Sequence, residues 1–203
     1  MNDISDEWSR RARRGGVAAV MSSRHSYQEN RLASEKMKKD VINFLERNYG
    51  SLEGKRVLEL GCGIGRFTRE LAARAGHVTA VDMTPEMLAR AREYTSGIQN
   101  ITYIRSRIAD LKAYLNFDIV FETITLLHIL DEQEYRKSID VMKSAAPCIF
   151  ICEHMSDNAP VSPYSRLRTF EQYEADFKPF RLAASDKNHY CAGDWFPMML
   201  FKE

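Results

Sequence analysis

The sequence has no excess of charge of either sign, since its 203 residues include 29 Lys and Arg against 28 Asp and Glu. With a formal net charge of +1, no overall field draws the protein to DNA, RNA or anionic lipid. The one basic cluster, at residues 10–14, lies beside an acidic start and indicates a solvated amphipathic helix. Nucleic-acid binding is the less favoured interpretation of this cluster, so we expect no nucleic-acid partner.

Long apolar runs are also missing. The most apolar stretch, residues 119–130, contains Glu122 and His128 and is too short to cross a bilayer. The first eight residues are acidic and lack the apolar segment of a signal peptide. Only four cysteines occur and none forms a CxxC pair, which favours buried thiols in a reducing cytoplasm over disulfides or a metal site. We expect a cytoplasmic protein with no membrane segment and no bound metal.

Strand-like and helical patterns alternate through the middle of the chain, which implies a parallel sheet with right-handed crossovers. A closing pair of strands is predicted at residues 177–185 and 194–202, and such a pair often places one antiparallel strand in the sheet. Five earlier strands are predicted at residues 55–61, 77–83, 101–106, 117–125 and 148–154, with helices at 66–74, 85–94 and 132–145.

The length suits a single α/β domain over residues 1–203. Apolar residues at helical spacing predict a helix over residues 33–49. We interpret residues 1–35 as an N-terminal helical cap or lid and residues 36–203 as a Rossmann-like core. A further lid insertion is predicted near residues 156–177.

The segment GCGIG follows the first predicted strand. Gly61, Gly63 and Gly65 allow a sharp turn and the close approach of a ligand, because glycine has no Cβ and tolerates positive φ. The helix that follows directs its first N–H groups at that ligand. Dinucleotide sites use the spacing G-x-G-x-x-G, whereas the spacing here is G-x-G-x-G. The pattern therefore favours a ligand that is smaller at this point than a pyrophosphate.

Two carboxylates flank this turn. Glu59 comes just before the glycines and suits a ligand with an ammonium group, while Asp82 ends the second strand and can accept both ribose hydroxyls. Met83 is placed to pack on an adenine face. Glu59 as a lone surface acid and Asp82 as a helix N-cap are the alternatives, although Thr84 is the better N-cap candidate. Together these residues predict a ligand in which an amino acid is joined to a nucleoside.

Three segments, VLELGCGIGRFT, AVDMTPEMLARAREY and FDIVFETITLLHI, resemble recurring segments of class I S-adenosylmethionine-dependent methyltransferases in order and spacing. The resemblance covers roughly residues 36–202. It implies an α/β fold with a seven-stranded Rossmann-like sheet, mostly parallel with the last strand antiparallel. It also implies S-adenosyl-L-methionine as cofactor and S-adenosyl-L-homocysteine as product.

The same resemblance implies roles for individual residues. The three glycines, with Cys62 among them, would flank the methionine part of the cofactor, and Asp82 would hold the ribose. The family often has an acid after the third strand, near the adenine amine, but Arg107 stands there in this sequence. Ile108 remains a candidate for a backbone N–H contact with adenine.

A narrower similarity links GCGIGRFT and the spacing to LLHIL with protein α-amine N-terminal methyltransferases. By that likeness Arg66 would pair with the cofactor carboxylate and His128 would match a site histidine. The later segment NAPVSPYSRLRT lacks the aspartate that those enzymes carry. We therefore do not adopt the peptide-amine assignment.

Polar side chains at the carboxyl ends of the fourth and fifth strands are catalytic candidates, because ligands bind at this edge of open α/β sheets. His128 is the first candidate for a general base, since the pKa of histidine lies near working pH. His154 and Glu122 are further catalytic candidates, and Glu122 is also a candidate cofactor contact. A histidine here can instead simply pack, and a neutral acceptor amine needs positioning alone.

Candidate substrate-side residues lie in the predicted lids. Tyr164, Arg166 and Arg168 are suited to binding a carboxylate or phosphate, although solvated helix charge is the commoner explanation. Tyr27 near the start is a candidate to close over the site, and His189 is a further histidine candidate. A helical lid with little else around the core predicts a small substrate.

The sequence therefore predicts a methyltransferase acting on an O or N nucleophile of a small molecule, in natural-product or secondary metabolism. A peptide α-amine or RNA methyltransferase and a non-catalytic cofactor-binding scaffold remain as alternatives. Neither the acceptor nor the oligomeric state can be predicted from the sequence, because pockets are built from residues scattered along the chain.

Overall fold

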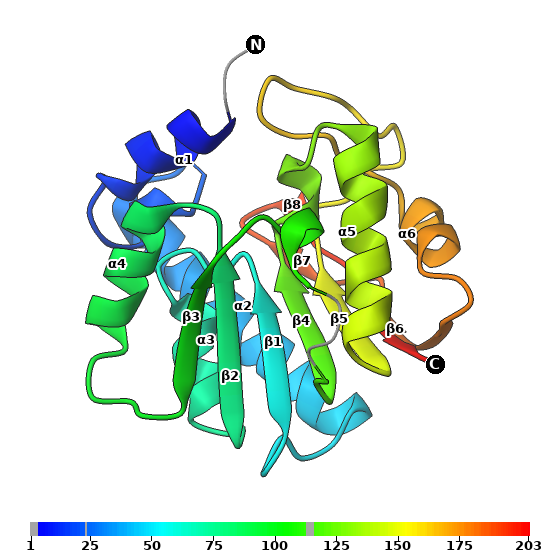
Figure 1. Ribbon diagram of the computed structural model, residues 1–203. Helices are drawn as coiled ribbons and strands as arrows, with labels where there is room; N and C mark the ends of the chain where they lie inside the picture. The colour runs from blue at the N-terminus through cyan, green and yellow to red at the C-terminus, as the bar shows by residue number, and fades with distance from the viewer. Residues whose placement is uncertain (1–3, 23, 113–115) are drawn as a thin grey trace.

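The computed structural model describes residues 4–22, 24–112 and 116–203 (Figure 1). Seven strands form one sheet in the order β3-β2-β1-β4-β5-β9-β6. Neighbouring strands pair in parallel, except that β9 runs antiparallel to both β5 and β6. The predicted seven-stranded, mostly parallel sheet with an antiparallel last strand is confirmed. The strands are β1 (Arg56–Leu60), β2 (His77–Asp82), β3 (Ile101–Arg105), β4 (Ile119–Thr123), β5 (Cys148–Cys152), β6 (Arg181–Asp186) and β9 (Met198–Lys202).

Helices cover both faces of this sheet, which explains the almost continuous apolar runs of its central strands. All five residues of β5 are buried. Helices α2 and α3 pack on the face that carries Phe121 and Phe150, whereas α5 and α6 pack on the face that carries Ile149 and Ile151. Figure 1 shows α5 in front of the sheet and α2 and α3 behind it. These helices are α2 (Tyr27–Asn48), α3 (Arg66–Ala72), α5 (Glu132–Ala145) and α6 (Phe170–Asp176), and α4 (Pro85–Tyr94) lies beside α3.

The N-terminal helices differ from the prediction in their limits. Helix α2 begins at Tyr27, six residues before the predicted start, because Ser26 and Glu29 form a capping box. The Ser26 hydroxyl accepts from the Glu29 backbone N–H at 3.3 Å, and the Glu29 carboxylate accepts from the Ser26 N–H at 2.7 Å. Upstream lie α1 (Ile4–Ala12) and the short 3-10 helix η1 (Gly16–Ala19).

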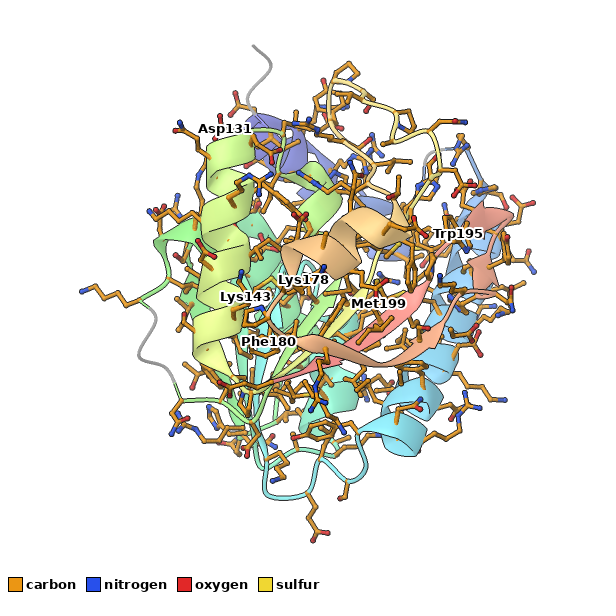
Figure 2. All side chains as sticks on the ribbon, turned by 90° about the vertical axis from the view of Figure 1, so that its right-hand side faces the viewer. Asp131, Lys143, Lys178, Phe180, Trp195 and Met199 are labelled. Atoms are coloured by element: carbon orange, nitrogen blue, oxygen red, sulfur yellow. The ribbon has the colours of Figure 1, made fainter. Side chains whose placement is uncertain are left out.

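The C-terminal part also differs. The last strand, predicted at residues 194–202, is divided into β8 (Asp194–Trp195) and β9. β8 pairs with β7 (Tyr190–Cys191) in a hairpin whose strands have two residues each. Part of the predicted lid is α6, whose Phe170 and Tyr173 are buried in the core. Figure 2 shows α6 next to α5, where Lys143 donates to the carbonyl oxygen of Lys178 at 3.3 Å. Among the described residues, no helix is both long and apolar enough to cross a bilayer.

Phe121 lies at the centre of the core and provides a test of it. Its ring stacks on Phe150 at 5.1 Å between centroids and contacts Phe67 at 5.2 Å. We expect Phe121→Ala to lower the free energy of unfolding by about 3–5 kcal/mol in urea denaturation, because it removes an aromatic side chain from close-packed surroundings. Leu32→Ala, at a side chain that is 59% exposed, is the control and should change stability by about 0.5 kcal/mol or less.

Candidate active site

A cavity of about 720 Å³ lies at the carboxyl ends of β1, β2 and β4, beneath α1. Its volume is in the range of small-molecule and cofactor sites, about 300–1,000 Å³. No residue of the predicted lid at 156–177 lines it. The predicted site residues that do line it are Glu59, Gly61, Cys62, Gly63, Arg66, Asp82, Met83, Arg107, Ile108 and His128.

The glycine turn is fixed by close contacts within the chain itself. Gly61 has φ +70°, and a Cβ there would lie 2.0 Å from the Thr125 hydroxyl oxygen. Gly65 has φ +83° at the N-cap of α3, where a Cβ would come within 3.2 Å of Ala91 on α4. The absence of a side chain at Gly61 therefore lets the loop after β4 pack against it, and the absence of one at Gly65 lets α4 pack close to the start of α3. Gly65 itself does not line the cavity.

Asp82 ties the glycine turn to the start of α4. Its two carboxylate oxygens accept from the Gly63 N–H at 2.9 Å and the Thr84 N–H at 2.8 Å. Thr84 is the N-cap residue of α4, but its side chain makes no capping hydrogen bond. Asp82 is thus not left free as the sequence suggested. Burial raises the pKa of Asp82, while the backbone N–H groups oppose that rise. Each oxygen has a second lone pair for a ligand hydroxyl.

Glu59 and Arg66 bring opposite charges to one side of the cavity. Glu59 is 3% exposed and accepts from the Thr68 hydroxyl at 2.6 Å. Burial raises the pKa of Glu59 to about 7. Arg66 donates to the Ser34 hydroxyl of α2 at 2.9 Å, and burial lowers its pKa. The pair suits the carboxylate and ammonium of an amino acid, because each charge here gains from an opposite partner.

An acidic residue does lie at the predicted adenine side, although it comes from a different element. Arg107 extends its guanidinium to both carboxylate oxygens of Glu134 at 3.0 Å. Glu134 belongs to the first turn of α5 and also lines the cavity. The sequence placed only Arg107 here, because no spacing rule connects α5 with the loop after β3.

The N-terminal cap lines one side of the cavity. The sequence predicted the cap but did not identify which of its residues reach the cavity. Trp8 and Val20 line the cavity, and a Cβ at Gly63 would lie 3.1 Å from the Val20 side chain. Arg90 of α4 holds the cap by donating to the carbonyl oxygens of residues 12, 14 and 16 at 2.9, 2.7 and 3.1 Å. Figure 1 shows α1 close to α4. The amphipathic pattern of α1 was the only sequence signal for this arrangement.

His128 is the only predicted catalytic residue that lines the cavity. Its Nδ1 lies 2.7 Å from the Tyr164 carbonyl oxygen, which can only accept, so Nδ1 carries the proton of the neutral ring. Its ring contacts Trp8 edge-on, with centroids 4.7 Å apart. Burial lowers the pKa of His128 to about 4. The ring is therefore neutral at pH 7 with a lone pair on Nε2.

The other predicted candidates lie outside the cavity. Glu122 is fully buried beside Glu153, and His154 contacts the Phe196 ring at 5.1 Å. His189 is held by the Phe196 carbonyl at 2.8 Å and by Asp40 at 3.2 Å. The remaining substrate-side candidates outside the cavity are Tyr27, Tyr164, Arg166 and Arg168.

The two arginines of the predicted lid have structural partners. Arg168 is 4% exposed, donates to the carbonyl oxygens of Leu126 and Ile129 at 3.1 and 3.3 Å, and stacks over Tyr135. Arg166 pairs with Glu132 at 3.2 Å. Neither side chain lines the cavity, so the structure does not bring them to a ligand there. In the described part of the chain, no three His, Cys, Asp or Glu side chains are grouped as metal ligands.

Comparison with known proteins agrees with this geometry. Residues 57–146 match the family model described as a methyltransferase domain. This match covers a little under half of the chain. NodS, an N-methyltransferase from Bradyrhizobium japonicum solved with S-adenosyl-L-homocysteine, has the same fold, with a TM-score of 0.78 at 15% identity over 100% of this chain and 99% of that one. The fold expected from the resemblance to class I methyltransferases is thereby confirmed.

Two curated relatives align with part of this chain. Phosphoethanolamine N-methyltransferase 1 of Triticum aestivum is 39% identical over 118 residues, which cover 54% of this chain and 24% of the relative. Malonyl-[acyl-carrier protein] O-methyltransferase of Bacillus anthracis is 27% identical over 129 residues, 63% of this chain and 46% of the relative. The aligned part thus spans less than half the length of each relative.

The protonation of His128 can be measured without a ligand. We expect its ring signals in NMR spectra to titrate with a midpoint near pH 4, because burial disfavours the imidazolium. The folded protein binds this proton at a lower pH than the unfolded chain does. His128 therefore lowers the free energy of unfolding as the pH falls from about 6.5 towards 4. His128→Gln assigns the signal. A midpoint near 6.5 would mean that the ring is hydrated rather than buried.

Proposed function

We propose that the protein is an S-adenosyl-L-methionine-dependent methyltransferase that methylates an O or N nucleophile of a small molecule. One observation carries the proposal: a single cavity is lined by Glu59, Arg66 and Asp82 around the glycine turn. This donor and acceptor set suits an amino acid joined to a nucleoside. We further propose that residues 1–35 act as the cap of one domain, because α1 and η1 cover that cavity.

The residues of the cavity divide among the parts of this cofactor. Arg66 would hold its carboxylate and Glu59 its ammonium, which would also favour the ionised form of Glu59. Asp82 would accept the ribose hydroxyls, and Met83 and Ile108 would pack on the adenine. When bound, S-adenosyl-L-methionine supplies a methyl group on a sulfonium, from which S-adenosyl-L-homocysteine leaves as product.

His128 is the proposed general base of the reaction. Its Nδ1–H is occupied by the Tyr164 carbonyl, which leaves Nε2 as the basic atom. Nε2 would take the proton that an O–H or N–H nucleophile loses as the bond to carbon forms. A small acceptor is favoured, because Trp8 of the cap contacts the His128 ring and restricts the space beside it.

Binding of S-adenosyl-L-homocysteine tests the cofactor assignment. We expect saturable binding in isothermal titration calorimetry, weakened more than tenfold by Asp82→Ala, because that variant loses the acceptor for two ribose hydroxyls. Asp82→Asn keeps one oxygen acceptor and should fall between the two. Absence of binding to the wild type would contradict the proposed function, and an unchanged affinity in Asp82→Ala would remove Asp82 from the site.

A transfer assay tests the role of His128. With a labelled methyl donor and a panel of small amines and phenols, we expect His128→Gln to lower kcat about 100-fold or more, as loss of a general base does. Its affinity for S-adenosyl-L-homocysteine should stay within about twofold, because the cofactor groups are elsewhere in the cavity. An unchanged kcat would show that the acceptor needs positioning alone.

A further inference from the structure

The turn after β4 carries His128 and has an unusual backbone. Ile124 has φ +55°, a conformation that is rare for a β-branched residue and costs free energy. Thr125 then packs against Gly61, and residues 126–128 form the 3-10 helix η3 (Leu126–His128). Such a conformation persists only where surrounding contacts impose it.

Two buried glutamates supply those contacts. Glu122 near the end of β4 and Glu153 just after β5 are both fully buried. The Thr125 N–H donates to Oε1 of both carboxyl groups, at 2.7 Å for Glu122 and 2.8 Å for Glu153. The Leu126 N–H also donates to both, at 3.3 and 2.6 Å respectively. The two carboxyl groups therefore share the first N–H groups of the turn.

Two adjacent buried carboxylates repel one another, and a proton between them removes that repulsion. The Oε2 atoms of both groups are buried and receive no hydrogen from another described side chain or backbone group. A hydrogen bond between the two carboxyl groups would satisfy these atoms, and it requires one proton. Burial and the neighbouring carboxyl raise the pKa of Glu122 well above its usual value.

We infer that Glu122 and Glu153 share one proton held by Glu122, and that the Glu153 carboxylate positions the turn that bears His128. The hydrogen bonds decide which group is charged, because N–H donors favour the ionised form. Glu153 receives three of them, including one from Leu127 at 3.4 Å, and holds the shortest at 2.6 Å. Glu122 receives two.

Neighbouring groups are consistent with a single negative charge. Arg168 grips the opposite side of the same turn through the carbonyl oxygens of Leu126 and Ile129. Three further titratable side chains close to the pair, Cys152, Tyr135 and Tyr173, are buried, and burial raises their pKa values, so they are uncharged at neutral pH. These three side chains bring no further negative charge to the pair.

The inference rests on the proposed function only for its catalytic consequence. Glu122 was predicted as a catalytic and cofactor residue, yet it does not line the cavity. Its role would be exerted through the backbone of residues 125–127, which fixes the direction of the His128 ring. Glu122 and Glu153 are therefore positioning residues. Their substitution should change the backbone of residues 125–127 directly and turnover only as a consequence.

Infrared spectroscopy tests the shared proton directly. At pH 8 we expect the wild-type protein to show the C=O stretch of a protonated carboxylic acid, and Glu122→Gln to lack it. Glu93→Gln, at an exposed site, is the matched control and should retain the band. Absence of the band in the wild type, or its persistence in Glu122→Gln, would overturn the inference. This measurement needs no acceptor, so it stands even if methyl transfer is not observed.

Amide hydrogen exchange tests the assignment of the charge. We expect Glu153→Gln to raise the exchange rate of the Leu126 amide about tenfold or more, because it loses a charge-assisted hydrogen bond. Glu122→Gln should raise it less than about threefold, since a carboxamide can replace a protonated carboxyl. The reverse order would assign the proton to Glu153. If Glu153→Gln does not fold, the infrared comparison of wild type and Glu122→Gln decides alone.

Stability and turnover give further arms of the test. Because the folded pair keeps a proton that the unfolded chain releases above the ordinary Glu pKa, the wild-type Tm should fall as the pH rises from 6 to 9. Glu122→Gln should reduce this dependence of Tm on pH.

Turnover is a separate test of the positioning role. In the transfer assay, Glu153→Gln should lower kcat about tenfold, while its affinity for S-adenosyl-L-homocysteine should stay within about twofold of the wild-type value. An equal change of Tm with pH in the wild type and Glu122→Gln would contradict the shared proton. A loss of affinity for S-adenosyl-L-homocysteine instead of kcat in Glu153→Gln would contradict the positioning role.

Discussion

The fit of Thr125 against Gly61 joins the two halves of the cavity, and the remaining geometry depends on it. Gly61 directly follows β1 and opens the glycine turn, and Thr125 begins the turn that leads to His128. Any side chain at position 61 would occupy the space of Thr125. The loop after β1 and the loop after β4 can therefore approach this closely only because position 61 has no side chain.

Buried charge is concentrated around that contact. Glu59, Asp82 and the Glu122–Glu153 pair all lie at the carboxyl ends of β1, β2, β4 and β5, and each accepts a hydrogen bond from a nearby N–H or hydroxyl. Burying these groups costs free energy unless they are hydrogen bonded. The hydrogen bonds that offset this cost also fix the loops of the cavity, so the polar groups determine its shape.

The sequence predicted the sheet well, and most of the residues that it assigned to the cofactor line the cavity, because both depend on local patterns. Strand and helix alternation predicts the topology, and Glu59, Asp82 and the glycines are fixed by position relative to strand ends. The residues that the sequence assigned to the substrate side do not line the cavity. Arg168 and Glu122 look like ligand-binding residues in sequence, but tertiary packing turns them towards the backbone of one loop. The early start of α2 was readable from the capping box at Ser26.

Arg90 grips the cap through three backbone carbonyl oxygens rather than through side chains. Every amino acid supplies that carbonyl, so residues 12 and 14 can change during evolution without loosening the anchor. The inner face of α1, which presents Ile4 and Trp8 to the cavity, is then free to diversify on a constant support. A domain of this kind can acquire new acceptors by substitutions in a single short helix while its methyl-donor side stays unaltered.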